Sequence, residues 1–159
     1  MSYKVFIISN VDDKPVINEI KEIFERYEIQ VIMPQYRIID GLMVLNKEQT
    51  SKSIRWSNCV LVIIRRMGSF SEDMESEIRQ SILLNKLVIP IVEEGSEIPN
   101  FLSNRQYILM DRGQPRLSYE RAAKYLKELK IDKEKKDALG GLLLLGLSIL
   151  LLAALASGD

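Results

Sequence analysis

Short apolar runs that alternate with helical patterns constrain the fold of this chain more than any other feature. Residues 5–8, 59–64 and 87–92 are apolar almost without interruption. A strand with one solvated face would alternate apolar and polar side chains instead. Strands that are apolar on both faces are typical of a parallel sheet covered by helices on both sides. The sequence therefore predicts an α/β fold.

Two further apolar runs, 30–33 and 106–110, bring the expected strands to five. Helices are expected over 15–27, 42–57, 71–84 and 117–130. The crossover 93–105 contains a proline and little helical periodicity, so we expect a loop with at most one turn there. This order predicts a flavodoxin-like five-stranded parallel sheet flanked by helices, a layout in which ligands bind beyond the carboxyl ends of the strands.

The segment 138–156 is a second constraint, because it holds ten leucines and no charged residue. As a helix it would reach nearly the ~30 Å of a bilayer's hydrocarbon core. Several lysines precede it closely: Lys130, Lys133, Lys135 and Lys136. Lysine-rich flanks stay in the cytoplasm, so we expect a domain at 1–130, a charged juxtamembrane linker at 131–137 and a single-pass carboxyl-terminal anchor. The alternative is a buried helix or an oligomer interface.

The residue types that are rare in this chain exclude several kinds of chemistry. It contains no histidine, which excludes histidine acid–base catalysis, Ser-His triads and most zinc sites. Its single cysteine, Cys59, lies in an apolar run and is expected to pack as a small apolar residue. Lysine plus arginine equals aspartate plus glutamate at 22 each, so no electrostatic footprint for nucleic acid is present.

The loops after the predicted strands argue against a resident cofactor. The loop 9–13 lacks the glycines of a flavin phosphate loop, and Arg65-Arg66 stands where a response-regulator receiver carries its phosphorylated aspartate. Neither G-x-G-x-x-G nor G-x-x-x-x-G-K-[ST] occurs. We therefore expect no metal and no permanently bound cofactor.

The order and spacing of these segments resemble the TIR domain, the Toll/interleukin-1-receptor-like module, from Lys4 to about Lys130. The resemblance is carried by residues 5–9, 12–15, the Asp40-Gly41 turn, 53–54, 57–64, 71–86 and 88–92. It implies a flavodoxin-like fold and self-association through the domain.

The resemblance also implies a catalytic residue. In TIR domains that cleave NAD, a glutamate on the third helix acts at the ribose next to nicotinamide, and Glu77 stands at that position. A carboxylate suits this role, because departure of nicotinamide leaves an oxocarbenium-like ribose. Asp73 replaces the aromatic residue that many enzymatic relatives carry four positions earlier. The alternative for Glu77 is a solvated helix residue in a helix that Ser69 and Glu72 begin as a capping box.

Nucleotide contacts are expected from Ser9 and Asn10 after the first strand, from Asp40 and Gly41 in the second loop, and from Arg65 after the third strand. Each has a structural alternative. Ser9 and Asn10 could serve ordinary turn chemistry, Asp40-Gly41 could form a tight turn, and Arg65 could lie in a solvated loop or contact a neighbouring copy.

The first function hypothesis is a membrane-tethered TIR effector that hydrolyses NAD when copies assemble. The second is a non-catalytic TIR adaptor that acts by homotypic assembly. A third class is a nucleotide-sensing module, or a nucleoside deoxyribosyltransferase-like enzyme that uses the same kind of glutamate. The expected partners are other copies of the chain, through the domain or the membrane helix, the lipid bilayer, and NAD or a related nucleotide.

Overall fold

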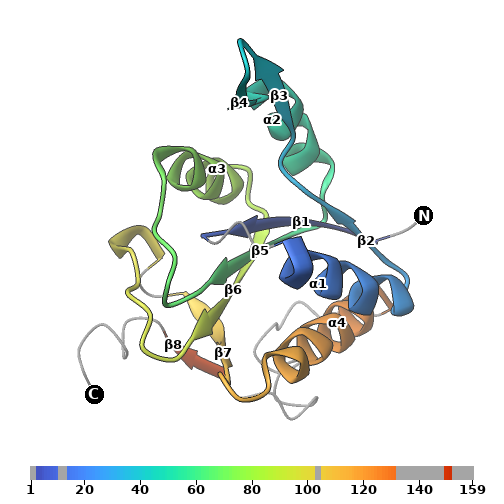
Figure 1. Ribbon diagram of the computed structural model, residues 1–159. Coiled ribbons are helices and arrows are strands. Elements are labelled where there is room, and N and C mark those ends of the chain that lie inside the picture. The colour runs from blue at the N-terminus through green and yellow to red at the C-terminus, as the bar shows by residue number, and fades with distance from the viewer. Residues whose placement is uncertain (1–2, 11–13, 103–104, 132–148, 152–159) are drawn as a thin grey trace.

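A parallel sheet forms the centre of the computed structural model, which describes residues 3–10, 14–102, 105–131 and 149–151. Its strands are β2 (Ile29–Ile32), β1 (Tyr3–Ser9), β5 (Cys59–Ile64), β6 (Leu87–Glu93) and β7 (Gln106–Met110), in that spatial order (Figure 1). The predicted flavodoxin-like five-stranded parallel sheet is confirmed. The crossover from β6 to β7 contains the single 3-10 turn η1 (Asn100–Leu102), as expected.

Helices cover both faces of the sheet. α1 (Lys14–Arg26) and α4 (Pro115–Ile131) lie on one face, and α2 (Lys47–Trp56) and α3 (Glu72–Leu83) lie on the other (Figure 1). Val5 and Ile7 of β1 pack in the cluster with α1 and α4, whereas Phe6 and Ile8 pack in the cluster with α2 and α3. The apolar runs lack polar alternation because both faces are covered.

The central strand β5 is buried along its whole length. Cys59 at its start belongs to the core, as expected for a small apolar side chain, and burial raises the pKa of its thiol. Burying one large aliphatic side chain contributes about 1.5–3 kcal/mol, so burial of β5 is a large stabilising contribution.

Residues 36–45 form a β-hairpin, which corrects the predicted helix over 42–57. β3 (Tyr36–Ile39) pairs antiparallel with β4 (Leu42–Leu45), and α2 begins only at Lys47. Asp40 and Gly41 form the turn with φ values of 52° and 79°. Two consecutive positive φ values are the geometry of a type I′ turn, which matches the twist of the flanking strands. The apolar residues 42–45 belong to that hairpin, and Asn46 caps α2 by accepting a hydrogen bond from the Gln49 N–H.

The predicted membrane helix at 138–156 falls almost entirely outside the described residues. The described part of it, β8 (Ile149–Leu151), is a strand rather than a helix and pairs antiparallel with β7. An edge strand offers unpaired backbone groups to which an extended apolar segment can bond. Among the described residues, none of the helices combines the length and the apolar character that a membrane span requires. Of the predicted linker, Ile131 ends α4 and 132–137 lie outside the described residues. Membrane anchoring stays a prediction.

Candidate functional site

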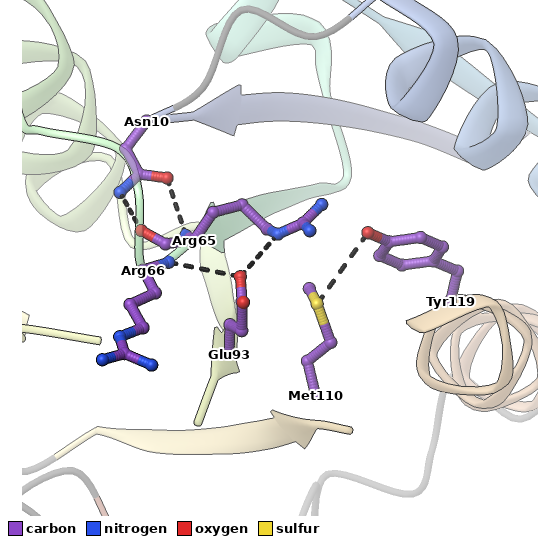
Figure 2. Close-up of polar contacts among 6 residues, drawn as sticks. All are labelled: Asn10, Arg65, Arg66, Glu93, Met110 and Tyr119. Carbon is purple, nitrogen blue, oxygen red and sulfur yellow. Dashed lines mark hydrogen bonds and ion pairs between the residues drawn. The ribbon is translucent and has the colours of Figure 1, made fainter. Parts of the chain in front are cut away.

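Ser9, Asn10 and Arg65 come together where the strand order reverses, at the carboxyl ends of β1 and β5. The Asn10 side chain binds both backbone groups of Arg65 (Figure 2). Its Oδ1 accepts from the Arg65 N–H at 2.7 Å, and its Nδ2 donates to the Arg65 carbonyl at 2.8 Å. Such reversals are the usual ligand sites of open α/β sheets. Of the five residues predicted to contact a nucleotide, these three lie at one edge of the sheet, and the nucleotide contacts themselves stay a prediction.

The Arg65 side chain forms an ion pair with Glu93 at the end of β6. Arg65 Nε lies 2.7 Å from Glu93 Oε2, and the Arg66 backbone N–H donates to the same oxygen at 3.2 Å. Burial by itself would raise the pKa of Glu93. The bonds from Arg65 and Arg66 and the charge of Arg112 outweigh burial and hold that pKa below its usual value. A phosphate would therefore have to compete with a carboxylate for Arg65.

Gly68 allows the loop after β5 to approach the end of β1. A Cβ added at this position would overlap the backbone oxygen of Asn10 and lie 2.6 Å from its Cγ. The φ of Gly68 is not in the left-handed region, so backbone conformation does not require glycine here. Close packing against the backbone of Asn10 requires it.

Glu77 lies on the buried side of α3, with 7% of its surface exposed, next to Met74, Ile78 and Ser81. The alternative of a solvated helix residue is therefore wrong. Within the described ranges, its carboxyl forms no hydrogen bond and no ion pair. The expected capping box at Ser69 is also wrong, because Ser71 caps the helix and accepts a hydrogen bond from the Met74 N–H. α3 starts two residues later than that box predicts.

Burial raises the pKa of Glu77 to about 7, and the charge of Asp73 one helical turn earlier adds to the effect. Among the residues that the structure describes, no positive charge or hydrogen bond lowers the pKa of this carboxyl. A carboxyl group with a pKa close to neutral can gain or lose a proton during a reaction near pH 7. Glu77 is buried, whereas the other acids on α3, Glu72, Asp73 and Glu75, lie nearer the solvent.

Polar contacts join α2 and α3 around this carboxyl. Lys47 Nζ lies 4.0 Å from Asp73 Oδ1, and Ser51 Oγ exchanges hydrogen bonds with the Gln80 amide at 3.1 and 3.2 Å. The Thr50 hydroxyl is buried and has no hydrogen-bond partner in the part of the chain that the structure describes. An open cavity of about 490 Å³ lies along the outer surface of the two helices. It is lined by Ser51, Glu72, Glu75, Ser76, Arg79, Gln80 and Leu83.

Asp40 and Gly41 lie elsewhere. They form the tip of the β3–β4 hairpin, which projects beside α2, away from the carboxyl ends of β1 and β5 (Figure 1). The structure does not bring them to Asn10 and Arg65, and their predicted nucleotide contacts stay a prediction. The tight-turn alternative is the one that the backbone angles support.

Glu93 and Arg112 are parts of the strand edge that sequence reasoning missed. Each follows or ends a predicted strand, so the general rule for α/β ligand sites was the available signal. Among the described residues, there is no cluster of three or more cysteines, aspartates or glutamates that could hold a metal ion.

Comparison with known proteins establishes the fold. No family model matches the sequence, and no curated protein matches it. A CMP N-glycosidase of Clostridium botulinum, BcmB, has a similar structure with a TM-score of 0.53 and 14% identity. The match covers 76% of this chain and 98% of that one. The TIR domains of the activated Roq1 resistosome, which recognises the pathogen effector XopQ, match with a TM-score of 0.46 and 15% identity, over 89% of this chain and 79% of that one.

Replacing Gly68 with alanine should destabilise the domain by about 1–3 kcal/mol, because the added methyl group overlaps backbone that cannot move independently of β1. Urea unfolding measures the loss. Gly113→Ala is the matched control, since its new Cβ would meet only Asp111 Oδ1, at 3.4 Å. Equal stabilities for the two variants would show that the loop after β5 does not depend on this close approach.

Glu77→Gln should become more stable relative to the wild type as pH rises. The folded-state pKa of about 7 is above the unfolded value, so the wild type loses stability between about pH 4.5 and about pH 7 as the buried carboxyl ionises. At about 1.4 kcal/mol per pKa unit, the difference between the proteins should shift toward the variant by about 2–3 kcal/mol from about pH 5 to about pH 8. Urea unfolding of both proteins at the two pH values measures this shift. A difference independent of pH would mean that Glu77 titrates normally.

Proposed function

We propose that this protein is a TIR-like N-glycosidase that hydrolyses NAD to nicotinamide and ADP-ribose, with Glu77 as the catalytic carboxylate. The observation that carries the proposal is the buried, unpaired Glu77 carboxyl, whose pKa is raised to about 7. Burying this carboxyl without a partner destabilises the folded protein when the carboxyl is ionised. Ionisable groups with strongly shifted pKa values are common at catalytic sites. A CMP N-glycosidase shares the fold, and its reaction class is the same cleavage of a bond between a ribose carbon and a ring nitrogen.

The chemistry requires few groups from the protein. The bond between ribose C1′ and the pyridinium nitrogen breaks, and its electron pair leaves with nicotinamide as a neutral ring. The ionised Glu77 carboxylate stabilises the positive charge that develops on the ribose. Water then adds to C1′ and releases one proton, which gives ADP-ribose. Because the leaving group needs no proton, the absence of histidine is no obstacle.

Membrane tethering is the second part of the proposal. Its support is the uncharged leucine-rich segment 138–156 with lysines before it, which would hold the domain at the cytoplasmic face of a bilayer. Copies confined to a surface meet at a raised effective concentration, which favours the assembly that the TIR resemblance implies.

A non-catalytic adaptor is the alternative, and the β3–β4 hairpin favours it. The hairpin exposes apolar side chains on both of its strands: Tyr36, Ile38, Ile39, Leu42, Met43 and Val44. Ile38 and Met43 are opposite each other in the register and are 76% and 71% exposed. Contiguous exposed apolar surface of this kind marks interaction sites, and a two-stranded ribbon also has two unpaired edges. The adaptor would use this hairpin for contacts between copies without turnover.

Full-length protein at high density in liposomes should release nicotinamide from NAD, and Glu77→Gln should reduce the rate by about 10²-fold or more. The rate should rise with pH through about 7, because the carboxylate is the active form. Glu72→Gln, a change of an exposed acid on the same helix, should leave the rate nearly unchanged. CMP, tested in parallel, shows whether a pyrimidine nucleotide is preferred. Folded, assembled protein that cleaves neither compound would favour the adaptor.

Ile38→Lys with Met43→Lys should weaken self-association at least about tenfold, because burying two exposed apolar side chains between copies is worth more than about 1.4 kcal/mol. Sedimentation velocity of full-length protein in detergent measures the association. Leu83→Lys, which places lysine at an 83% exposed apolar position outside the hairpin, is the matched control. An unchanged association constant in the double variant, or an equal loss in the control, would exclude the hairpin as the assembly surface.

A further inference from the structure

Two arginines at the carboxyl edge of the sheet remain without a role. Arg66 follows β5, and Arg112 follows β7. Both side chains are exposed, and neither guanidinium forms a hydrogen bond or an ion pair within the part of the chain that the structure describes. Arg65 differs, because Glu93 holds its Nε. In Figure 2 the Arg65 side chain extends toward Tyr119, whereas the Arg66 side chain points away from it.

These two arginines converge on one glycine. A Cβ built on Gly95, in the loop after β6, would have Arg112 Nη2 at 3.2 Å and Arg66 Nε at 3.7 Å. Three loops that follow three neighbouring strands therefore bring two guanidinium groups to the same small region. Gly95 has a φ of +81° and no side chain, so it both makes the turn and leaves space between the two arginines.

The acidic residues of the neighbouring loops do not form ion pairs with Arg66 or Arg112 among the described residues. Glu94 and Glu97 lie in the same loop as Gly95, and Asp111 precedes Arg112. Within the described residues none of the three forms an ion pair with either arginine, and Asp111 accepts a hydrogen bond from the Gly113 N–H instead. Glu93 is engaged through Oε2 by Arg65 and by the Arg66 backbone. The Arg66 and Arg112 guanidinium groups thus keep donors that can bind an anion.

We propose that Arg66 and Arg112, arranged around Gly95, form a binding site for the phosphate of a nucleotide. Guanidinium groups match phosphate oxygens with paired N–H donors, and each oxygen accepts at about 2.9 Å. A phosphate between the two side chains would add negative charge beside both guanidinium groups, of which Arg112 already interacts with the charge of Glu93 at longer range. Arg66 follows Arg65, whose backbone Asn10 binds, so the Arg66 side of the site begins next to the point where the strand order reverses. The nucleotide identity of the ligand rests on the proposed function, whereas phosphate binding itself does not.

The experiment compares the binding of AMP, adenosine and inorganic phosphate by isothermal titration calorimetry, with full-length protein in detergent. AMP should bind wild type at least about tenfold more tightly than adenosine, and R66Q with R112Q should remove that advantage. Arg121→Gln, which removes an exposed arginine from α4, should keep the advantage. An AMP affinity in the double variant equal to that of wild type would overturn the proposal. If inorganic phosphate binds as tightly as AMP, the claim that the ligand is a nucleotide would be refuted.

A second measurement uses wild-type protein, so its result does not depend on whether the arginine variants fold. Phenylglyoxal modifies accessible arginines, and mass spectrometry locates the adducts. AMP should protect Arg66 and Arg112 several-fold more than it protects Arg121, and protection elsewhere would overturn the assignment. Intact AMP binding in a wild type that cleaves no NAD would refute the proposed reaction while leaving the phosphate site standing.

Discussion

Burial of the central strands on both faces is the constraint on which the rest of this structure depends. All six residues of β5 and four consecutive residues of β1 are buried, so the sheet has no face on which polar chemistry could be displayed. The polar side chains next to these two central strands lie at the strand ends, and others lie on the edge strand β2 and on the helices. Asn10, Arg65 and Glu93 accordingly occur where three neighbouring strands finish, and they bind one another because each would otherwise be a partly buried polar group without a partner.

The two helix layers that cover the buried strands differ in their contacts. α1 and α4 cover one face with mainly apolar contacts, including Ile20, Ile23 and Phe24 of α1. α2 and α3 cover the other face and carry the polar contacts between Lys47 and Asp73 and between Ser51 and Gln80. Glu77 lies in this second layer. An ion pair between Arg116 and Glu19, at 3.3 Å, also joins α1 and α4, so the feature that distinguishes the second layer is the buried carboxyl of Glu77.

Much of the fold and only part of the site could be predicted from the sequence. The apolar runs predicted all five parallel strands, because burial on both faces leaves a signal that needs no tertiary information. The hairpin was missed because residues 42–45 are apolar and continuous with a helical pattern, although the Asp40-Gly41 pair is a strong turn signal. The pairing of Arg65 with Glu93 spans 28 positions and is visible only after the strands are placed side by side. The burial of Glu77 depends on how α3 is rotated against α2, which periodicity does not define to one residue.

The unpaired carboxyl of Glu77 has a consequence for how ligand and solvent act on this domain. A proton and a positively charged ligand group would compete for the same buried oxygen atoms, because either one removes the cost of an isolated charge. Binding of a cationic ring beside Glu77 would therefore release a proton, and a lower pH would weaken binding. This effect on binding would not depend on turnover. A helix carboxyl held without a partner would thus make occupancy by a cationic ligand depend on the acidity of the surroundings.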